Sequence, residues 1–157
     1  MSATLKPSYG SKTSITITLN GLTNSSSRSS AAVDNSSNLF VDALVQIKVK
    51  TNASGTSGTG TVNIYVYASA DGGTSYPDGC GTDTGISSVA DLRFLGQVNT
   101  VANSTSYISE PMSVASAFGG LLPENWGIAV QNLSGATLDS TAGNFDAFFQ
   151  PLNLTVG

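Results

Sequence analysis

The sequence contains no histidine, a single cysteine and few charged residues. Its 157 residues include six Lys and Arg and ten Asp and Glu, so charged side chains make up 10% of the chain. Proton transfer and metal chemistry near neutral pH rely largely on His or on tuned carboxylate, Lys or Cys groups. Ser-His-Asp catalysis is excluded because there is no His, and the Cys80 thiol has no His to activate it. The composition predicts a protein that is not an enzyme and uses no cofactor.

The scarcity of charge also limits the partners that the chain can bind. The formal net charge is -4 and the six basic residues are scattered, whereas a nucleic-acid groove needs clustered Lys and Arg. No apolar run approaches the roughly 20 residues of a membrane span, and MSATLKPSYG lacks the charged-then-apolar order of a signal peptide. The lone Cys80 excludes an intrachain disulfide framework. We expect no nucleic-acid partner, no membrane, and stability that comes from core packing or subunit contacts.

Apolar side chains recur at every second position in several segments, which is the pattern of half-buried strands. Residues 13–19 alternate without a break and are expected to point Ile15, Ile17 and Leu19 inward. Further strands are expected over residues 39–50, 61–70, 92–98, 106–109, 126–131 and 145–156. The residues expected on the buried face of the two central strands are Val45, Ile47, Val62, Ile64 and Val66. In the last segment, Pro151 is expected to place part of the strand at a sheet edge.

These elements predict an all-β fold with at most one short helical turn, at residues 113–118 with Ser113 as its N-cap. Short strands separated by turn-rich segments favour an antiparallel β-sandwich, with a jelly-roll-like topology as the leading choice. We expect one domain over residues 1–157, in which residues 1–12 form a flexible or partner-contacting N-terminal arm.

Three polar segments are expected to be long loops. Residues 20–38 read as a surface crossover or contact arm, and residues 51–60 as a mobile hairpin loop between two strands. Residues 71–88 form the most turn-dense part of the chain. Because a long loop in a compact domain is often functional, Ser25, Ser26, Ser27 and Arg28 are candidate partner-contact residues.

Tyr65 and Tyr67 are expected on the outward face of their strand. They either pack against a neighbouring strand or a lid loop, since aromatic residues pair well across strands, or form a flat contact surface for a partner. With Tyr76 and Trp126 they would form a sugar-stacking platform. Trp126 opens an apolar strand, however, which favours a core or rim position.

Asp71, Asp78 and Asp83 lie in a Gly-rich loop and are the best candidates for a Ca²⁺ site, because Ca²⁺ takes oxygen ligands. Their spacing matches no EF-hand loop and Asp before Gly commonly makes a turn, so turn chemistry is the favoured interpretation and no metal is expected. A glycosidase pair would have to come from Asp71, Asp91, Glu110 and Glu124. Nothing in the sequence places any two of these together.

Longer stretches of the sequence resemble a known class of protein. SSAAVDNSSNLFVDALVQIKVKT, YVYASADGGTSYPD, LRFLGQV and PMSVASAFGGLLPENWGIAVQNLSGA are similar to small β-rich virion structural proteins of tailed bacteriophages. The resemblance extends from about Ile15 to Phe145 and carries over no catalytic residue. It implies a particle component, most directly a capsid decoration (cement) protein, and tail-associated or fibre proteins use similar sandwiches.

The leading hypothesis is therefore a virion structural protein that binds the outer head surface and stabilises the shell. Its expected partners are the major capsid protein and further copies of itself, and it would be made in the host cytoplasm without a signal peptide. The alternative is a receptor- or glycan-binding module on the tail or a fibre. An enzyme acting on cell-surface carbohydrate is a distant third.

Overall fold

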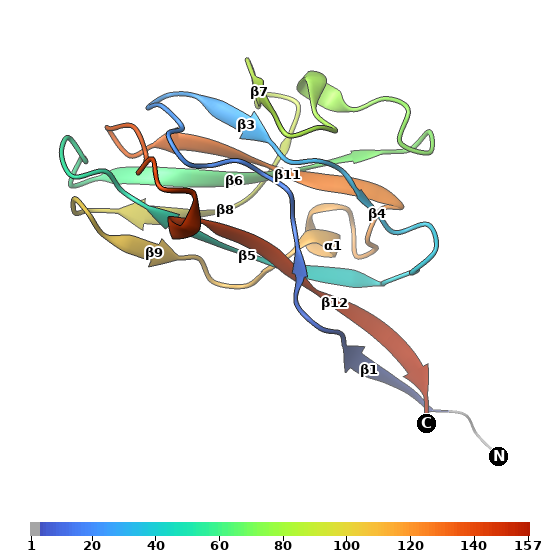
Figure 1. Cartoon of the computed structure of the whole chain (residues 1–157). Helices are drawn as coiled ribbons and strands as arrows, with labels where there is room; N and C mark the ends of the chain where they lie inside the picture. Colours follow the sequence, from blue (N-terminus) through green and yellow to red (C-terminus); the bar gives the residue numbers. More distant parts are fainter. Residues whose placement is uncertain (1–3) are drawn as a thin grey trace.

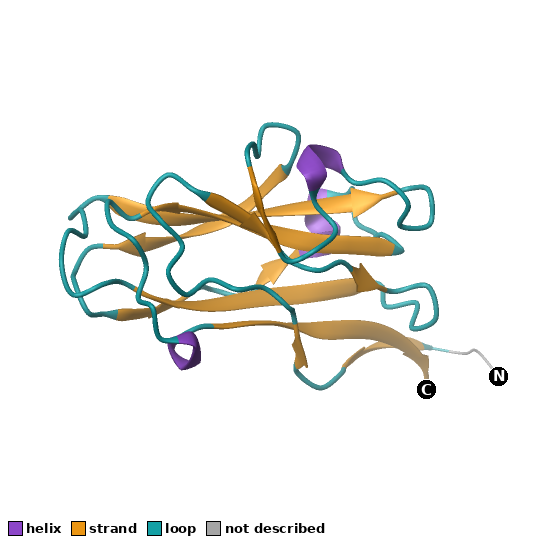
Figure 2. Ribbon diagram, turned by 45° about the horizontal axis from the view of Figure 1, so that its top comes forward, coloured by secondary structure: helices purple, strands orange, loops and turns teal. Residues whose placement is uncertain are grey.

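The computed structural model describes residues 4–157 and contains two antiparallel β-sheets that pack face to face (Figures 1 and 2). Sheet A has the order β1 (Leu5–Tyr9), β12 (Asp146–Val156), β5 (Asp42–Lys50) and β10 (Met112–Ser113), with β2 (Thr13–Ser14) also paired to β12 and β9 (Ser106–Ile108) to β5. Sheet B has the order β7 (Thr84–Ile86), β3 (Ser27–Ser29), β11 (Asn125–Leu133), β6 (Gly60–Ser69) and β8 (Arg93–Thr100), with β4 (Val33–Asp34) also paired to β11. The all-β sandwich expected from the sequence is confirmed, but this strand order does not confirm a jelly-roll topology.

The core lies between β5 and β12 of sheet A and β6 and β11 of sheet B. All five residues expected on the buried face of the central strands are fully buried: Val45, Ile47, Val62, Ile64 and Val66. Strict alternation along β5 explains this agreement, because successive side chains of a strand point to opposite faces. Trp126 in β11 is 0% exposed and its ring packs edge-to-face on Phe149 of β12, with ring centroids 5.2 Å apart. The two sheets are therefore joined by aromatic as well as aliphatic contacts.

Short helical segments occur only in connections among the described residues. The helix α1 (Val114–Ala117) begins after Ser113, whose side chain accepts a hydrogen bond from the Ser116 backbone N–H, as the sequence predicts. Two 3₁₀ turns, η1 (Pro77–Gly79) and η2 (Ala142–Asn144), lie in loops. None of these helices is long and apolar enough to cross a membrane.

The strand expected over residues 13–19 is paired only at its first two residues, β2. Residues 15–19 run along the edge of the sandwich, where the Ile15 N–H donates to the Ala147 carbonyl. Ile15 and Leu19 are nevertheless buried, so the alternation gave the correct inward face. The prediction was wrong about length because alternation reports burial and does not report whether a neighbouring strand is present.

The interpretation of residues 20–38 as one long polar loop, a surface crossover or contact arm, is wrong where the segment forms strands. This segment contributes β3 and β4 to sheet B, both paired with β11. Ser29 and Ser30 are fully buried, and the Ser30 N–H donates to the Ile128 carbonyl. Hydroxyl side chains bury readily when they are hydrogen-bonded, so a serine-rich strand carries no apolar alternation that would reveal it.

Two further expectations are also corrected. Residues 51–60 do not close a hairpin, because β5 belongs to sheet A and β6 to sheet B, so this segment crosses between the sheets. Pro151 does not lie at an edge, because β12 is flanked by β5 and by the N-terminal segment. The Gln150 side-chain amide donates to the Gly10 carbonyl at 3.2 Å and replaces the N–H that Pro151 lacks. Gly10 is required there because a Cβ would lie 2.7 Å from the Pro151 ring.

Replacement of Ile64 by Ala tests the register of the core strands. The fully buried side chain leaves a cavity between the sheets, so the free energy of unfolding should fall by roughly 2 to 5 kcal/mol in urea unfolding. Lys48→Ala, on the outer face of β5, is the control and should change stability by less than about 0.5 kcal/mol. Equal effects of the two substitutions would contradict this assignment of faces.

Candidate interaction surfaces

The four predicted contact residues at 25–28 lie together beside one hollow at the edge of sheet B. Ser25 is exposed, Ser26 and Arg28 are half-buried and Ser27 is buried in β3. All four line a hollow of about 500 Å³ whose wall also includes Ser87, Ser88 and Gln131. Most of its lining side chains carry hydroxyl or amide groups, so the hollow offers hydrogen-bond donors and acceptors and few apolar contacts.

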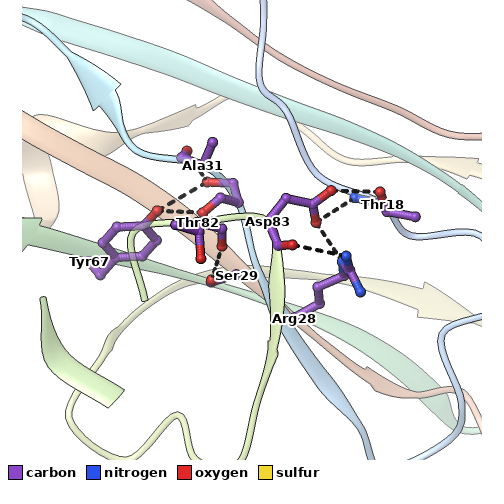
Figure 3. A network of polar contacts seen from close by, with 8 residues as sticks. Thr18, Arg28, Ser29, Ala31, Tyr67, Thr82 and Asp83 are labelled. Atoms are coloured by element: carbon purple, nitrogen blue, oxygen red, sulfur yellow. Dashed lines mark hydrogen bonds and ion pairs between the residues drawn. The ribbon is translucent and has the colours of Figure 1, made fainter. Parts of the chain in front are cut away.

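Arg28 also has a structural role, because it holds the loop before β7 against the edge of the sandwich (Figure 3). Its Nε lies 2.5 Å from Asp83 Oδ1, and its Nη2 donates to the Asp83 carbonyl. Asp83 in turn accepts hydrogen bonds from the Thr18 backbone N–H at 3.0 Å and the Thr18 hydroxyl at 2.6 Å. Burial alone raises the pKa of the Asp83 carboxyl, but the hydrogen bonds from Arg28 and Thr18 outweigh it and leave that pKa below its usual value. We call these three residues the Arg28 clamp.

Tyr67 points outward from sheet B as expected, but it is covered and is not a contact surface in this structure. Its hydroxyl donates to the Ser30 carbonyl at 2.7 Å, and the Tyr76 ring covers it edge-to-face at 5.4 Å (Figure 3 shows the hydroxyl). Burial raises the pKa of Tyr67 to about 12. Cys80 belongs to the same covering loop, and burial raises the pKa of its thiol to about 11. The thiol is therefore protonated near neutral pH and is a poor nucleophile.

The three aspartates considered for Ca²⁺ have separate partners. Asp71 accepts hydrogen bonds from Ser69, Thr74 and Ser75, and these bonds, led by the Ser69 hydroxyl, lower its pKa to about 2. Asp78 accepts from the Asp91 N–H, and Asp83 belongs to the Arg28 clamp. Across residues 4–157, no group of three His, Cys, Asp or Glu side chains is placed to hold a metal ion. The aspartates act as turn and loop anchors in this structure.

The aromatic platform that includes Trp126 is not formed, because Trp126 is in the core. A different shelf lies on the outer face of β6 and β8, where Tyr65 packs edge-to-face on Phe94 with ring centroids 5.6 Å apart. Phe94 is 55% exposed. The Tyr65 hydroxyl donates to Gln131 Oε1, and the strand register places Asn63 between Gln131 and Gln97 on the same face. The shelf therefore combines an exposed ring with a row of amides and adjoins the polar hollow at Gln131.

The two ends of the chain form a ribbon that projects beyond the sandwich (Figure 1). Within the arm expected over residues 1–12, residues 1–3 lie outside the described part, and β1 pairs with residues 152–156 of β12. The register places six apolar residues on one face of this terminal ribbon: Leu5, Pro7, Tyr9, Leu152, Leu154 and Val156. The other face carries Lys6, Ser8, Asn153 and Thr155. Four of the apolar residues, Leu5, Tyr9, Leu154 and Val156, are between 52% and 71% exposed.

An apolar hollow of about 400 Å³ lies at the end of the sandwich from which the ribbon projects. Its lining residues are Leu39, Phe40, Val41, Leu121, Leu122, Asn35, Ser36 and Glu124. Leu39 and Leu121 are 73% and 71% exposed. The Val41 N–H donates to the Leu152 carbonyl at 2.9 Å, so the wall of the hollow is bonded to the base of the ribbon. We call the ribbon and this hollow together the apolar end.

The loop that carries Leu39 is held by side-chain hydrogen bonds from Asn35. The Asn35 side chain both donates to the Phe40 carbonyl and accepts from the Phe40 N–H, at 3.0 and 2.9 Å. These bonds hold Leu39 at a φ of +53°, a left-handed conformation that is costly for a leucine. On the other side of the hollow, the Leu122 N–H donates to the Val41 carbonyl. Both exposed leucines are therefore presented by bonded turns.

The expected partner-contacting arm over residues 1–12 includes β1, but its pairing with β12 and the apolar hollow were not predicted from the sequence. Leu5, Pro7 and Tyr9 alternate with polar residues, which is a pattern typical of a strand with one apolar face. The same spacing occurs at the C-terminal end of β12. The hollow had no comparable signal, because its two walls are loops separated by about eighty positions in the sequence.

Substitution of Asp83 by Asn tests the Arg28 clamp. The change removes the ion pair and leaves the half-buried Arg28 without its anionic partner, so urea unfolding at pH 7 should show a loss of roughly 1 to 3 kcal/mol. Because the pKa of Asp83 is lowered in the folded state, the clamp's contribution is present above the unfolded carboxylate pKa of about 4 and is lost as the pH falls through the lower folded value.

The Asp83→Asn protein should therefore lose less stability than the wild type between pH 5 and pH 2. Asp146→Asn, which removes the more exposed ion pair with Lys12, is the matched control and should change stability by less than about 1 kcal/mol. Parallel pH profiles for the wild type and the Asp83→Asn protein would contradict the role given to this carboxylate.

Comparisons with known proteins identify no relative of this chain. The chain matches no protein-family model, no curated protein and no solved structure.

Proposed function

We propose that the chain is a structural component of a tailed-phage particle, a capsid decoration protein that binds and stabilises the head shell. The observation that carries this proposal is the apolar end, where the ribbon and two hydrogen-bonded turns hold large apolar side chains in solvent. Contiguous exposed apolar surface typically marks a protein contact. The resemblance of residues 15–145 to phage virion proteins supplies the particle context.

The low charge of the chain also supports a role in assembly. Only 10% of the chain is charged, and interface cores are depleted of charge because unpaired ionic groups are costly to bury. A protein that binds the assembled shell adds its binding free energy to that state, and repeated copies multiply the effect. The proposed mechanism is reinforcement by mass action, without a chemical step.

Purified particles test this proposal. The 15.9 kDa chain should be present in many copies per particle, and shells stripped of it should break at a lower temperature than decorated shells. Leu121→Ser should lower occupancy on the shell at least tenfold in binding constant, whereas Val101→Ser, an exposed apolar residue on a loop elsewhere, should leave it unchanged. Stripped shells that are as robust as decorated ones would contradict the decoration role.

The shelf of Tyr65 and Phe94 supports a second candidate, a glycan-binding module on the tail or a fibre. Sugars are bound by stacking on an exposed ring and by planar amides and hydroxyls, and the shelf and the adjoining polar hollow offer all three. The Oδ1 atom of Asn63 is buried and has no hydrogen-bond partner in the protein. A module of this kind would be present in only a few copies per particle.

A glycan array with the purified protein tests this second candidate. Binding to any glycan should be lost, by at least tenfold in affinity, in Phe94→Ala and retained in Val101→Ala, because only Phe94 belongs to the shelf. If the wild type binds no glycan, or if both variants bind equally well, the shelf is not a sugar site.

A further inference from the structure

We propose that the apolar end binds the apolar end of a second copy of this chain, with the terminal ribbon of each copy lying in the apolar hollow of the other. The inference rests on the proposed function in one respect, that the apolar end is a protein contact. It names the partner of that surface, which the proposal of a decoration protein leaves open.

The ribbon and the hollow are complementary features of one chain. The ribbon is a projecting strand pair with one apolar face, and the hollow is a concave surface with leucines on opposite sides. Of the ten exposed large apolar side chains in the described residues, six belong to these two features. The apolar face of the ribbon carries no charged side chain, because Lys6 lies on its other face.

The position of the two features favours a reciprocal pair. The ribbon projects beyond the end of the sandwich (Figure 1), and the Val41 N–H in the wall of the hollow donates to the Leu152 carbonyl at the base of the ribbon. In a two-fold arrangement each residue that contacts a partner residue is matched by the reverse contact. Two copies facing one another therefore insert two ribbons at once and cover both hollows.

The unpaired edge of β1 indicates that the contact between copies is made by side chains and not by hydrogen-bonding of another strand to this edge. The Gly10 N–H donates to Pro151 and the Gly157 N–H donates to Thr4, which sets the bonding pattern of the strand pair. By the alternation of antiparallel pairing, residues 5, 7 and 9 direct their backbone groups away from β12. Pro7 has no N–H, so the middle of this edge lacks a donor and is a poor template for another strand. An unlimited stack of strands is thereby disfavoured, while the apolar face stays available.

The conformation of Leu39 supports the same conclusion. A leucine at positive φ is retained where the surrounding structure enforces it, and such strain is concentrated at functional sites. Here the Asn35 hydrogen bonds enforce it, and the result is a leucine held out beside the hollow. In the proposed pair this side chain lies against the partner's ribbon, so the strained turn has a use that it lacks in an isolated chain.

Light scattering coupled to size exclusion, run on the free protein over a range of concentrations, tests the inference. The wild type should have twice the mass of one chain. Leu121→Ser, in the hollow, and Leu154→Ser, on the ribbon, should each raise the dissociation constant at least tenfold, and Val101→Ser should leave it unchanged. All three residues are exposed, so the variants should keep the wild-type circular dichroism spectrum and melting temperature.

Cysteine cross-linking checks the pairing itself. In a Cys80→Ser background, chains carrying Leu154→Cys mixed with chains carrying Leu121→Cys should form a disulfide between different chains. Chains carrying Val101→Cys are the control and should form no disulfide with either of the other two variants. A wild type that stays monomeric, or an oligomer that neither serine variant weakens, would overturn the inference. If a monomeric protein still decorates particles, the inference fails and the proposed function stands. If the protein pairs but is absent from particles, the inference stands and the proposed function fails.

Discussion

The pairing of β1 with the last residues of β12 is the contact on which the proposed assembly depends. It is made beyond the sandwich, so no second sheet covers either face. A strand pair outside a core is marginally stable in water, because it buries little apolar surface. This ribbon is anchored at its base, where β12 continues into sheet A between β5 and β2, and its apolar face remains in solvent. In the proposed pair, the burial that stabilises the ribbon comes from the second copy.

The sandwich supplies the rigid support that such a ribbon needs. Eleven residues of β12 form one continuous strand, of which the first half is fixed by pairing with β5 and by core residues such as Phe149. On the opposite sheet, the Arg28 clamp ties β3 to Asp83 and Thr18, and the Tyr67 hydroxyl bonds the Ser30 carbonyl. Hydrogen bonds therefore hold the serine-rich parts in place, while apolar packing holds the central strands.

Much of this fold could be predicted from the sequence, for a definite physical reason. Where apolar residues alternate, as in β5 and β6, burial of one face dictates both the strand and its orientation. Where hydroxyls replace them, as in β3, the strand is specified by its partner β11, which lies about a hundred positions away and leaves no local pattern. The partners of Arg28 and the two walls of the hollow are likewise distant in sequence. From the sequence, the serines beside the polar hollow were assigned to a surface crossover or contact arm, and residues 1–12 to a flexible or partner-contacting arm. Neither the strand β3 nor the apolar hollow was predicted.

The most direct test of the central claim is hydroxyl-radical footprinting of side chains, on purified particles and on the free protein diluted until it is monomeric. The account predicts that Tyr9, Leu39 and Leu121 are labelled strongly in the dilute protein and are protected in the particle. Phe94, which is 55% exposed and belongs to the shelf on the outer face of sheet B, should be labelled in both and serves as the internal reference. Equal labelling of Tyr9, Leu39 and Leu121 in the two states would contradict the claim that the apolar end is buried on assembly.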